Sequence, residues 1–339
     1  MKNQKRARDF GIIIGNMPPG KYNSITDVPG VKVGHSTLDE GDIKTGVTAI
    51  LPHDGNIFRE KIIGACYVIN GFGKSLGLIQ IEELGNIETP IILTNTLSVG
   101  TAHEALVKYM LSIDEDIKSL NPIVGECNDG YLNDIRGLHV KEDHVFQALE
   151  NASIEFEEGN VGAGTGMVCY GLKGGIGTSS RIINIDNKNY TVGVLVLSNF
   201  GLMKDLKIDG ISVGKQLSKS LEEHNQDDRG SIILIVATDI PLSNRQLKRV
   251  IKRTNPGIAR TGGFIGHGSG EIAIGFSTGN VIIHDKDNDI LDIKILNESK
   301  INQVFRATSE ATEEAILNSL FCSNTTTGVD GHTVYSLLD

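Results

Sequence analysis

The sequence contains no tryptophan, few other aromatic residues and only four cysteines among its 339 residues. Aromatic side chains make up 5% of the chain, which argues against a binding module lined with aromatic rings. The cysteines are far apart, form no CxxC pair, and have no histidine cluster at metal-ligand spacing beside them. We therefore expect free thiols in a reducing compartment and no metal site.

Positive charge is also in short supply. The 32 lysines and arginines are outnumbered by 42 aspartates and glutamates, and the net charge of −10 argues against nucleic acid or an anionic membrane as a primary partner. No segment approaches the roughly 18 consecutive apolar residues of a membrane-spanning helix. The run Phe10–Ile14, after a basic start, is too short for the apolar core of a signal peptide. These absences predict a cytoplasmic protein.

Glycine, with 40 residues, and short apolar runs are abundant instead. Uninterrupted runs of valine, isoleucine and leucine are typical of strands buried on both faces. The expected strands are Ile62–Asn70, Ile91–Asn95, Val192–Asn199, Ser231–Ala237, Glu271–Ser277 and Val281–His284. Helical spacing of apolar residues predicts helices over Thr101–Leu111, Asp143–Glu150, Asn244–Arg253 and Asn302–Phe321. We expect a layered α/β fold with helices on the outer faces of its sheets, and a solvated connection over Ser218–Gly230.

The densest glycine block, Gly159–Gly177, does not match a nucleotide-binding loop. Gly162 and Gly164 would require a further glycine where Met167 stands, and no Gly-Lys-Ser/Thr sequence closes the block. We therefore interpret the block as close backbone packing or substrate approach, and we expect no nucleotide cofactor.

The segment that carries most chemical information is Gly-His-Gly-Ser-Gly-Glu, residues 266–271. From Glu271 onward the pattern alternates as in a half-buried strand, so Ser269 lies where a glycine loop meets a rigid element. Attack of its hydroxyl on the Gly268 carbonyl, an N→O acyl shift and hydrolysis would leave Ser269 as a new N-terminus. The hydroxyl would then be a nucleophile, and the α-amine a base near neutral pH. Read alone, the segment also fits a simple Gly/Ser turn before a strand.

Other polar groups end apolar runs or cluster on a helix. Glu126 could hold a substrate ammonium or cap a local turn. The amide of Asn199 could donate to an oxyanion or terminate a strand in a turn. The hydroxyls and carboxylates of 308–314 could orient the amine of a nucleophile or form a solvated helix face. Cys127 has no neighbouring cation in the sequence, and we interpret it as a structural thiol.

Nine segments, taken together, resemble the self-processing aminopeptidase family that includes L-aminopeptidase/D-esterase and the β-peptidyl aminopeptidases. They follow the family order from about residue 23 to the C-terminus, and their joint occurrence is highly specific. The segments are Asn23–His35, Leu93–Gly100, Gly125–Asp134, Gly175–Arg181, Val192–Gly201, Ala237–Leu242, Ala259–Gly262, Gly268–Gly270 and Ala311–Ala315. The resemblance implies a four-layer αββα sandwich of the N-terminal-nucleophile type and a homotetramer or larger assembly. It implies no metal or organic cofactor.

The same resemblance implies roles for individual residues. Ser269 corresponds to the nucleophile released by cleavage after Gly268, which divides the single domain into 1–268 and 269–339. Asn199 corresponds to an oxyanion donor, and Glu126 to the group that recognises the free amine of the substrate.

Further roles implied by the resemblance are distributed over the C-terminal half and the Glu126 segment. The hydroxyl–carboxylate pair that steadies the α-amine of the nucleophile falls on Thr312 and Glu314, with the same spacing present at 308 and 310. Tyr131 is the local candidate for a functional tyrosine in substrate binding. His267, beside the scissile bond, assists processing or has no role.

The expected function is an aminopeptidase that releases N-terminal residues from small peptides, amides or esters through an acyl-enzyme on Ser269. One alternative is an acyltransferase of the ornithine-acetyltransferase type, in which an amine competes with water for the acyl-enzyme. Another is an unprocessed chain that acts as a non-catalytic binding protein.

Overall fold

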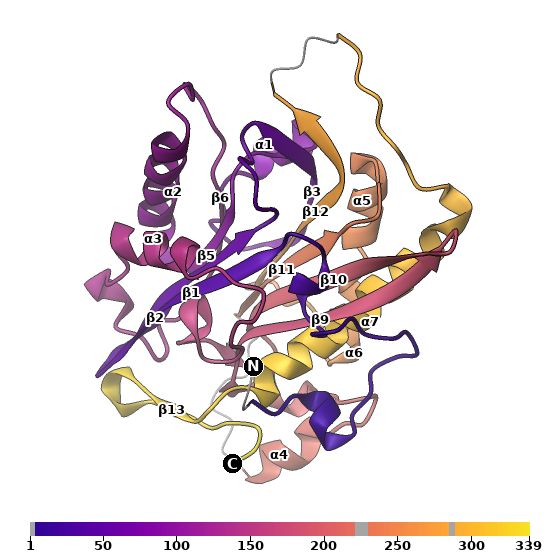
Figure 1. The fold of residues 1–339 in the computed structure, drawn as a ribbon. Helices are drawn as coiled ribbons and strands as arrows, with labels where there is room; N and C mark the ends of the chain where they lie inside the picture. The colour runs from indigo at the N-terminus through magenta and orange to yellow at the C-terminus, as the bar shows by residue number, and fades with distance from the viewer. Residues whose placement is uncertain (1–3, 221–229, 285–288) are drawn as a thin grey trace.

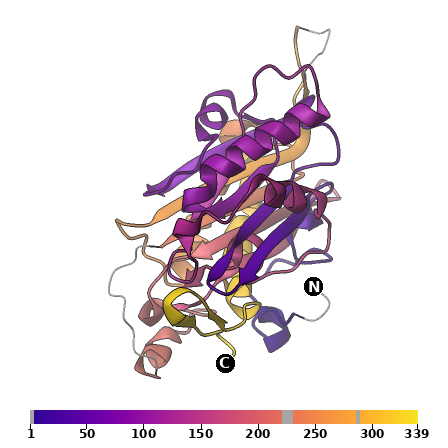
Figure 2. The ribbon, with the colours of Figure 1, turned by 90° about the vertical axis from the view of Figure 1, so that its left-hand side faces the viewer.

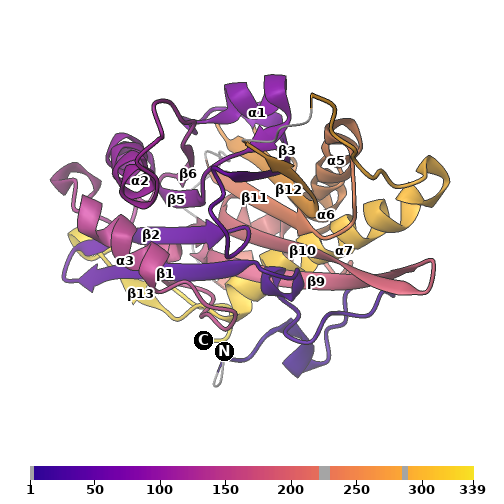
Figure 3. The ribbon, with the colours of Figure 1, turned by 45° about the horizontal axis from the view of Figure 1, so that its top comes forward.

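Two stacked β-sheets with helices outside both make up the molecule (Figures 1 and 3). The computed structural model describes residues 4–220, 230–284 and 289–339. Most of the expected solvated connection, residues 221–229, lies outside the described residues. In the described stretches, no helix has the length and apolar character needed to cross a bilayer.

The small sheet has the strand order β1-β2-β5-β6. Its strands are β1 (Lys32–Glu40), β2 (Ile43–Leu51), β5 (Ile91–Asn95) and β6 (Ile123–Cys127). Helices α2 (Val99–Ile113) and α3 (Glu142–Glu150) cover its outer face, which is toward the viewer in Figure 2.

The large sheet has the order β4-β3-β12-β11-β10-β9. Its strands are β3 (Glu60–Gly71), β4 (Asn86–Ile87), β9 (Gly175–Ile185), β10 (Lys188–Asn199), β11 (Ser231–Thr238) and β12 (Gly270–Ile283). Helices α5 (Asn244–Ile251), α6 (Thr254–Arg260) and α7 (Ile301–Phe321) cover its outer face. The remaining elements are α1 (Leu78–Leu84), α4 (Gly214–Ser220), and the short pairs β7 (Val168–Cys169) with β8 (Leu172–Lys173) and β13 (Thr326–Thr327) with β14 (Thr333–Val334).

Alternating side chains of the large sheet fill two separate cores. On β11, Ile233 and Ile235 belong to the core between the sheets, whereas Ile232 and Leu234 belong to the core under α5, α6 and α7. This alternation follows from the two-residue period of a strand, and it explains why β11 is apolar without interruption. The layer order helix–sheet–sheet–helix confirms the four-layer αββα sandwich predicted from the sequence.

The expected strands did not include β2 and β6 of the small sheet or the two-residue β4 of the large sheet, and two longer strands of the large sheet also differ from the prediction. The separate strands expected over 271–277 and 281–284 are one strand, β12, with a register shift against β3 between Ser277 and Val281. Strand β9 was not predicted because Thr178, Ser179 and Ser180 interrupt its apolar pattern, yet all three are fully buried. Each hydroxyl donates a hydrogen bond to a backbone or side-chain oxygen of a neighbouring element, so none of the three is buried without a partner.

Close backbone packing explains the glycine block before β9. A Cβ atom at Gly175 would lie 2.0 Å from the carbonyl oxygen of Gly159, and its φ of +147° is a conformation that other residues rarely adopt. The prediction of close packing over Gly159–Gly177 therefore agrees with the structure.

Candidate active site

Ser269 lies at the end of the large sheet where β10 ends and where β11 and β12 begin. Asn199, the last residue of β10, pairs with Ser231 of β11, and Ser231 pairs with Gly270 of β12. Ser269 directly precedes Gly270, so its backbone lies two strands from Asn199, about 10 Å at the usual strand spacing.

The small sheet reaches the same edge through the end of β6. Nδ2 of Asn199 donates to the carbonyl of Asn128 over 3.0 Å, and Sγ of Cys127 lies 3.6 Å from the carbonyl oxygen of Leu197. Burial raises the pKa of the Cys127 thiol well above its ordinary value, so the thiol stays protonated. Cys127 is therefore packed between the sheets as an inert thiol, in agreement with its interpretation from the sequence.

Ser269 is fully buried in a tight turn. Its Oγ lies 2.9 Å from the carbonyl oxygen of Gly266 and within hydrogen-bond distance of the Glu271 carboxylate, so these two acceptors share its single proton. Nδ2 of Asn70 donates to the carbonyls of Gly266, His267 and Ser269, and so holds the turn from the end of β3. The side chain of His267 is exposed, on the outer side of this turn.

The loop before Ser269 is also conformationally strained. Ile265 has a φ of +63°, a left-handed conformation that is unusual for a β-branched residue. Such strain costs on the order of 1–3 kcal/mol and persists only where the surrounding contacts impose it. Asn70 holds the residues that follow Ile265 through the carbonyls of Gly266 and His267.

The side-chain amide of Asn199 is held at both ends. Its Oδ1 accepts from the backbone N–H of Val168 over 2.8 Å, and its Nδ2 donates to Asn128. An amide NH₂ has two donor positions, and the contacts of the described residues use one of them. Asn199 therefore presents a fixed N–H donor near the end of β10, as oxyanion binding requires.

Glu126, at the end of β6, is buried and hydrogen-bonded through both carboxylate oxygens. Oε1 accepts from the backbone N–H of Lys74 over 2.8 Å, and Oε2 accepts from the hydroxyl of Thr96. These partners come from other segments, so Glu126 does not cap its own turn. A Cβ atom at Gly73 would lie 3.3 Å from Oε1 of Glu126 and 3.6 Å from Cδ1 of Ile272, so the carboxylate lies near β12, the strand that Ser269 precedes.

Tyr131 lies on the surface beside the C-terminal hairpin. Its ring stacks on His332 with 4.5 Å between ring centroids and 5° between ring planes, and nearly half of the residue is exposed. No contact in the described part of the chain joins Tyr131 to Ser269, so its predicted role in substrate binding stays a prediction.

The structure does not bring Thr312 and Glu314 to Ser269. Both are on α7, which lies on the outer face of the large sheet, and Oγ1 of Thr312 bonds to the carbonyl of Thr308 within the helix. Glu314 contacts Arg181 of β9. The strand pairings from β9 to β12 place Arg181 at the same height in the sheet as Ser277. Ser277 is eight residues beyond Ser269, about 26 Å at the usual rise of a strand.

The pair at 308 and 310 is equally remote from Ser269. Oγ1 of Thr308 bonds to the carbonyl of Val304, and Glu310 accepts from the backbone N–H groups of Asn16 and Met17. The alternative of a solvated helix face is wrong as well, because the side chains from Thr308 to Glu314 are buried. Spacing along a helix could not reveal which neighbours cover it.

Glu314 instead joins the N-terminal segment to the large sheet. Arg8 donates two hydrogen bonds to its carboxylate over 2.6 and 2.9 Å, Arg181 donates one over 2.7 Å and Asn23 one over 2.5 Å. Burial alone would raise the pKa of Glu314, but the bonds and charges of Arg8 and Arg181 hold that pKa below its ordinary value. Glu314 is therefore ionised in the folded protein.

Replacing Glu314 with glutamine should destabilise the protein, because it removes the counter-charge of Arg8 and leaves buried Arg181 with Glu310 alone, at 3.4 Å. Breaking a buried ion pair typically costs about 3–5 kcal/mol of unfolding free energy. Because the folded-state pKa is lowered, this stabilisation is present above the unfolded glutamate pKa of about 4.3 and is lost as the pH falls through the folded value. Denaturant unfolding at pH 7 and at acid pH should show a difference between wild type and variant that shrinks in acid. A variant as stable as wild type at pH 7 would contradict this role.

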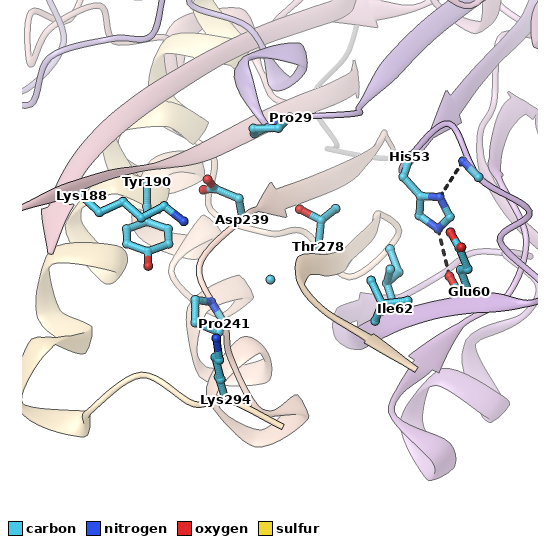
Figure 4. Close-up of a pocket in the computed structure, with 13 residues that line it drawn as sticks. Pro29, His53, Glu60, Ile62, Lys188, Tyr190, Asp239, Pro241, Thr278 and Lys294 are labelled. Carbon is cyan, nitrogen blue, oxygen red and sulfur yellow. Dashed lines mark hydrogen bonds between the residues drawn. The ribbon is translucent and has the colours of Figure 1, made fainter. Parts of the chain in front are cut away.

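A separate cavity of about 580 Å³ lies at the opposite end of the large sheet (Figure 4). Asp239, directly after β11, and Thr278, in the second half of β12, line it together with Lys188, Tyr190 and Lys294. Ser269 is not among its lining residues, so this cavity and the nucleophile candidate are distinct features. In residues 4–220, 230–284 and 289–339, no group of three or more histidine, cysteine or carboxylate side chains is arranged to hold a metal.

Comparison with known proteins identifies close relatives along nearly the whole chain. The sequence model of peptidase family S58 matches residues 23–334. The β-peptidyl aminopeptidase BapA of Sphingosinicella microcystinivorans is 39% identical over 355 residues, which cover 98% of this chain and 89% of that protein.

Two solved structures share the architecture. The PH0078 protein of Pyrococcus horikoshii OT3 superposes with a TM-score of 0.94 at 54% identity, covering 98% of this chain and 96% of the other. The L-aminopeptidase D-Ala-esterase/amidase of Ochrobactrum anthropi, described as a variant of the Ntn hydrolase fold, gives a TM-score of 0.90 at 35% identity, with 98% and 95% of the chains covered.

Proposed function

Because the chain belongs to peptidase family S58 and is a serine aminopeptidase of the N-terminal-nucleophile fold, we propose that Ser269 becomes its nucleophile through cleavage of the Gly268–Ser269 bond. One observation carries this proposal. The Ser269 hydroxyl is held in a buried turn directly before β12, at the end of the large sheet where β10 ends at Asn199 and where the end of β6, which carries Glu126, contacts β10.

In the proposed reaction, the free α-amine of Ser269 takes the proton of its own hydroxyl as Oγ attacks the substrate carbonyl. The same amine returns the proton to the leaving group, and water hydrolyses the resulting ester. Asn199 donates to the oxyanion of each tetrahedral intermediate, a contribution that is worth most where the donor is already oriented. The substrates are small peptides, amides or esters with a free N-terminal amine, which the Glu126 carboxylate binds.

The relatives with named activities are peptidases, aminopeptidases or amidases. They therefore favour hydrolysis over acyl transfer to an amine and over a non-catalytic binding protein. The homotetramer and the cytoplasmic location belong to the same proposal and rest on the family resemblance and on composition.

Replacing Glu126 with glutamine should weaken turnover of free-amine substrates while the Gly268–Ser269 bond is still cleaved. A charge-assisted bond to an ammonium is roughly twice as strong as a neutral one, so loss of the charge should lower kcat/KM by about 10- to 100-fold. The measurement compares kcat/KM for a free dipeptide amide and for its N-acetylated form in wild type and variant. The wild type should discriminate strongly between the two substrates, and the variant should discriminate weakly.

Lys74→Ala is a matched control, because Lys74 contacts Glu126 through its backbone N–H and the substitution leaves that donor in place. This control should keep the preference for free amines. Cleavage of acetylated and free substrates at equal rates by the wild type would overturn the aminopeptidase assignment.

A further inference from the structure

The glycine block Gly159–Gly177 contains a single charged side chain, that of Lys173. Lys173 belongs to the short strand β8 and is fully buried. Burying an ammonium group is costly unless its N–H groups are hydrogen-bonded, so a lysine in this position is retained at the expense of stability. None of the reaction steps proposed above uses it.

Three backbone carbonyls surround the Lys173 side-chain nitrogen. Nζ donates to the carbonyl of Gly174 over 2.7 Å, to that of Met167 over 2.8 Å and to that of Gly164 over 3.0 Å. The three acceptors match the three N–H donors of a protonated amine. Burial lowers the pKa of Lys173 to about 7, so this form is populated near and below neutral pH. The lysine therefore ties the turn that ends at Met167 to its own strand.

The residue after this turn holds the proposed oxyanion donor. The backbone N–H of Val168 donates to Oδ1 of Asn199 over 2.8 Å. Val168 in turn pairs with Lys173 in the two-residue ladder of β7 and β8. Because Oδ1 and Nδ2 lie on opposite sides of the amide, the bond from Val168 sets the direction in which Nδ2 points. One hydrogen bond thus separates the Asn199 amide from the backbone that Lys173 holds.

We propose that Lys173 is a positioning residue for the oxyanion donor. It holds the backbone of 164–168 in place, so that Val168 keeps the Asn199 amide directed toward the reacting carbonyl. Among the described residues the ammonium bonds to backbone carbonyls, and it therefore acts through Asn199 and not on the substrate. This inference rests on the proposed function, in which Asn199 binds the oxyanion. Such a donor needs accurate placement, since an error of about 1 Å can cost on the order of 10²-fold in rate.

Lys173→Met removes the three bonds without an obvious barrier to folding. Methionine is unbranched and apolar, and it buries no charge. Each of the three carbonyls also keeps a second donor, which is the N–H of Met167, the N–H of Gly174 or the hydroxyl of Ser323. The variant should therefore fold with a less rigid turn, and circular dichroism with thermal unfolding checks that it does.

Steady-state kinetics, expressed per mole of cleaved chain, measure the effect. In Lys173→Met, kcat should fall by about 10- to 100-fold while KM changes little, as for any loss of placement that matters mainly in the transition state. The decisive comparison is the double variant. Because Lys173 acts through Asn199, adding Lys173→Met to Asn199→Ala should lower kcat by less than about 2-fold. A lysine that only stabilises the fold would lower kcat by the same factor in both backgrounds.

Lys61→Met is the matched control. Lys61 is another largely buried lysine of the large sheet, and its ammonium bonds to Glu88. It pairs with Ile282, at the far end of β12 from Ser269. This variant should keep the wild-type kcat even if its stability falls.

Lys173→Gln replaces the methionine variant if that protein does not fold. Glutamine has no charge but retains two N–H donors, which can still satisfy part of the turn. It should likewise lower kcat in the wild-type background and leave kcat unchanged in the Asn199→Ala background.

The outcomes separate this inference from the proposed function. If Asn199→Ala loses turnover but the Lys173 variant keeps the wild-type kcat, Lys173 has no positioning role and the proposed function stands. An equal further loss in both backgrounds, or a change confined to KM, also removes the positioning role. If Asn199→Ala itself turns over normally, the oxyanion assignment in the proposed function is wrong, and the inference falls with it.

Discussion

Replacing Ser269 with alanine should leave one uncleaved chain of 339 residues without aminopeptidase activity. The substitution removes the hydroxyl that attacks the Gly268 carbonyl, so neither the α-amine nor the nucleophile is formed. Loss of a serine nucleophile typically costs on the order of 10⁶-fold in turnover. The wild type should give fragments of 268 and 71 residues, with masses of about 29 and 8 kDa when the chain mass is divided by length. Denaturing electrophoresis and intact-mass spectrometry distinguish the two outcomes.

Ser277→Ala provides the control for this experiment. Ser277 is a buried serine on the same strand, but its hydroxyl bonds to the carbonyl of Ile240 at the other end of the sheet. This variant should be cleaved and active. A fully active wild type that runs as a single intact band would overturn the mechanism, as would normal cleavage of the Ser269→Ala protein.

The second large effect is expected at Asn199. Removing one oriented oxyanion donor typically lowers kcat by about 10²–10³-fold, and Asn199→Ala should fall in this range. KM should change less, because the contact strengthens mainly as charge develops on the carbonyl oxygen. Self-cleavage should slow too, since it passes through a similar tetrahedral oxyanion. Steady-state kinetics on the cleaved protein and a time course of fragment appearance measure both effects.

Asn189→Ala is the matched control for Asn199. Asn189 is near the other end of β10, where its amide bonds only to Asn184 among the described residues. Turnover and cleavage should be unchanged in this variant. If a folded Asn199→Ala protein matures and turns over normally, Asn199 only closes β10, and backbone N–H groups of the glycine-rich loops must bind the oxyanion.

The apolar pattern by itself predicted much of the large sheet and the helices α2, α3, α5 and α7, but β5 was its one listed strand of the small sheet. Strand β5 begins and ends at Ile91 and Asn95 as predicted, and α7 begins one residue before its predicted start and ends at Phe321. These segments are specified locally, because an apolar run or a helical spacing of apolar residues is stable only when it is buried. Strand β9 was missed because its burial depends on hydrogen bonds from distant segments, including that of Ser179 to the carbonyl of Ala311.

The sequence also determined which residues could carry the chemistry. A serine after a glycine loop, an amide at the end of one strand and a carboxylate at the end of another are local patterns. They identified Ser269, Asn199 and Glu126 as candidates. Their meeting at one edge was decided only by the tertiary structure, because it depends on the register of β10, β11 and β12 and on the contact between the two sheets.

Tertiary structure alone decided the roles of the remaining carboxylates. The spacing of Thr312 and Glu314 suggested a pair beside the nucleophile, but α7 packs on the outer face of the large sheet, where Arg8 and Arg181 neutralise Glu314. Glu271 gave no signal beyond a polar residue at the start of an apolar strand, yet its side chain meets Ser269. Spacing fixes which side chains share one face of one element, whereas the neighbours of that face come from chain segments hundreds of residues away.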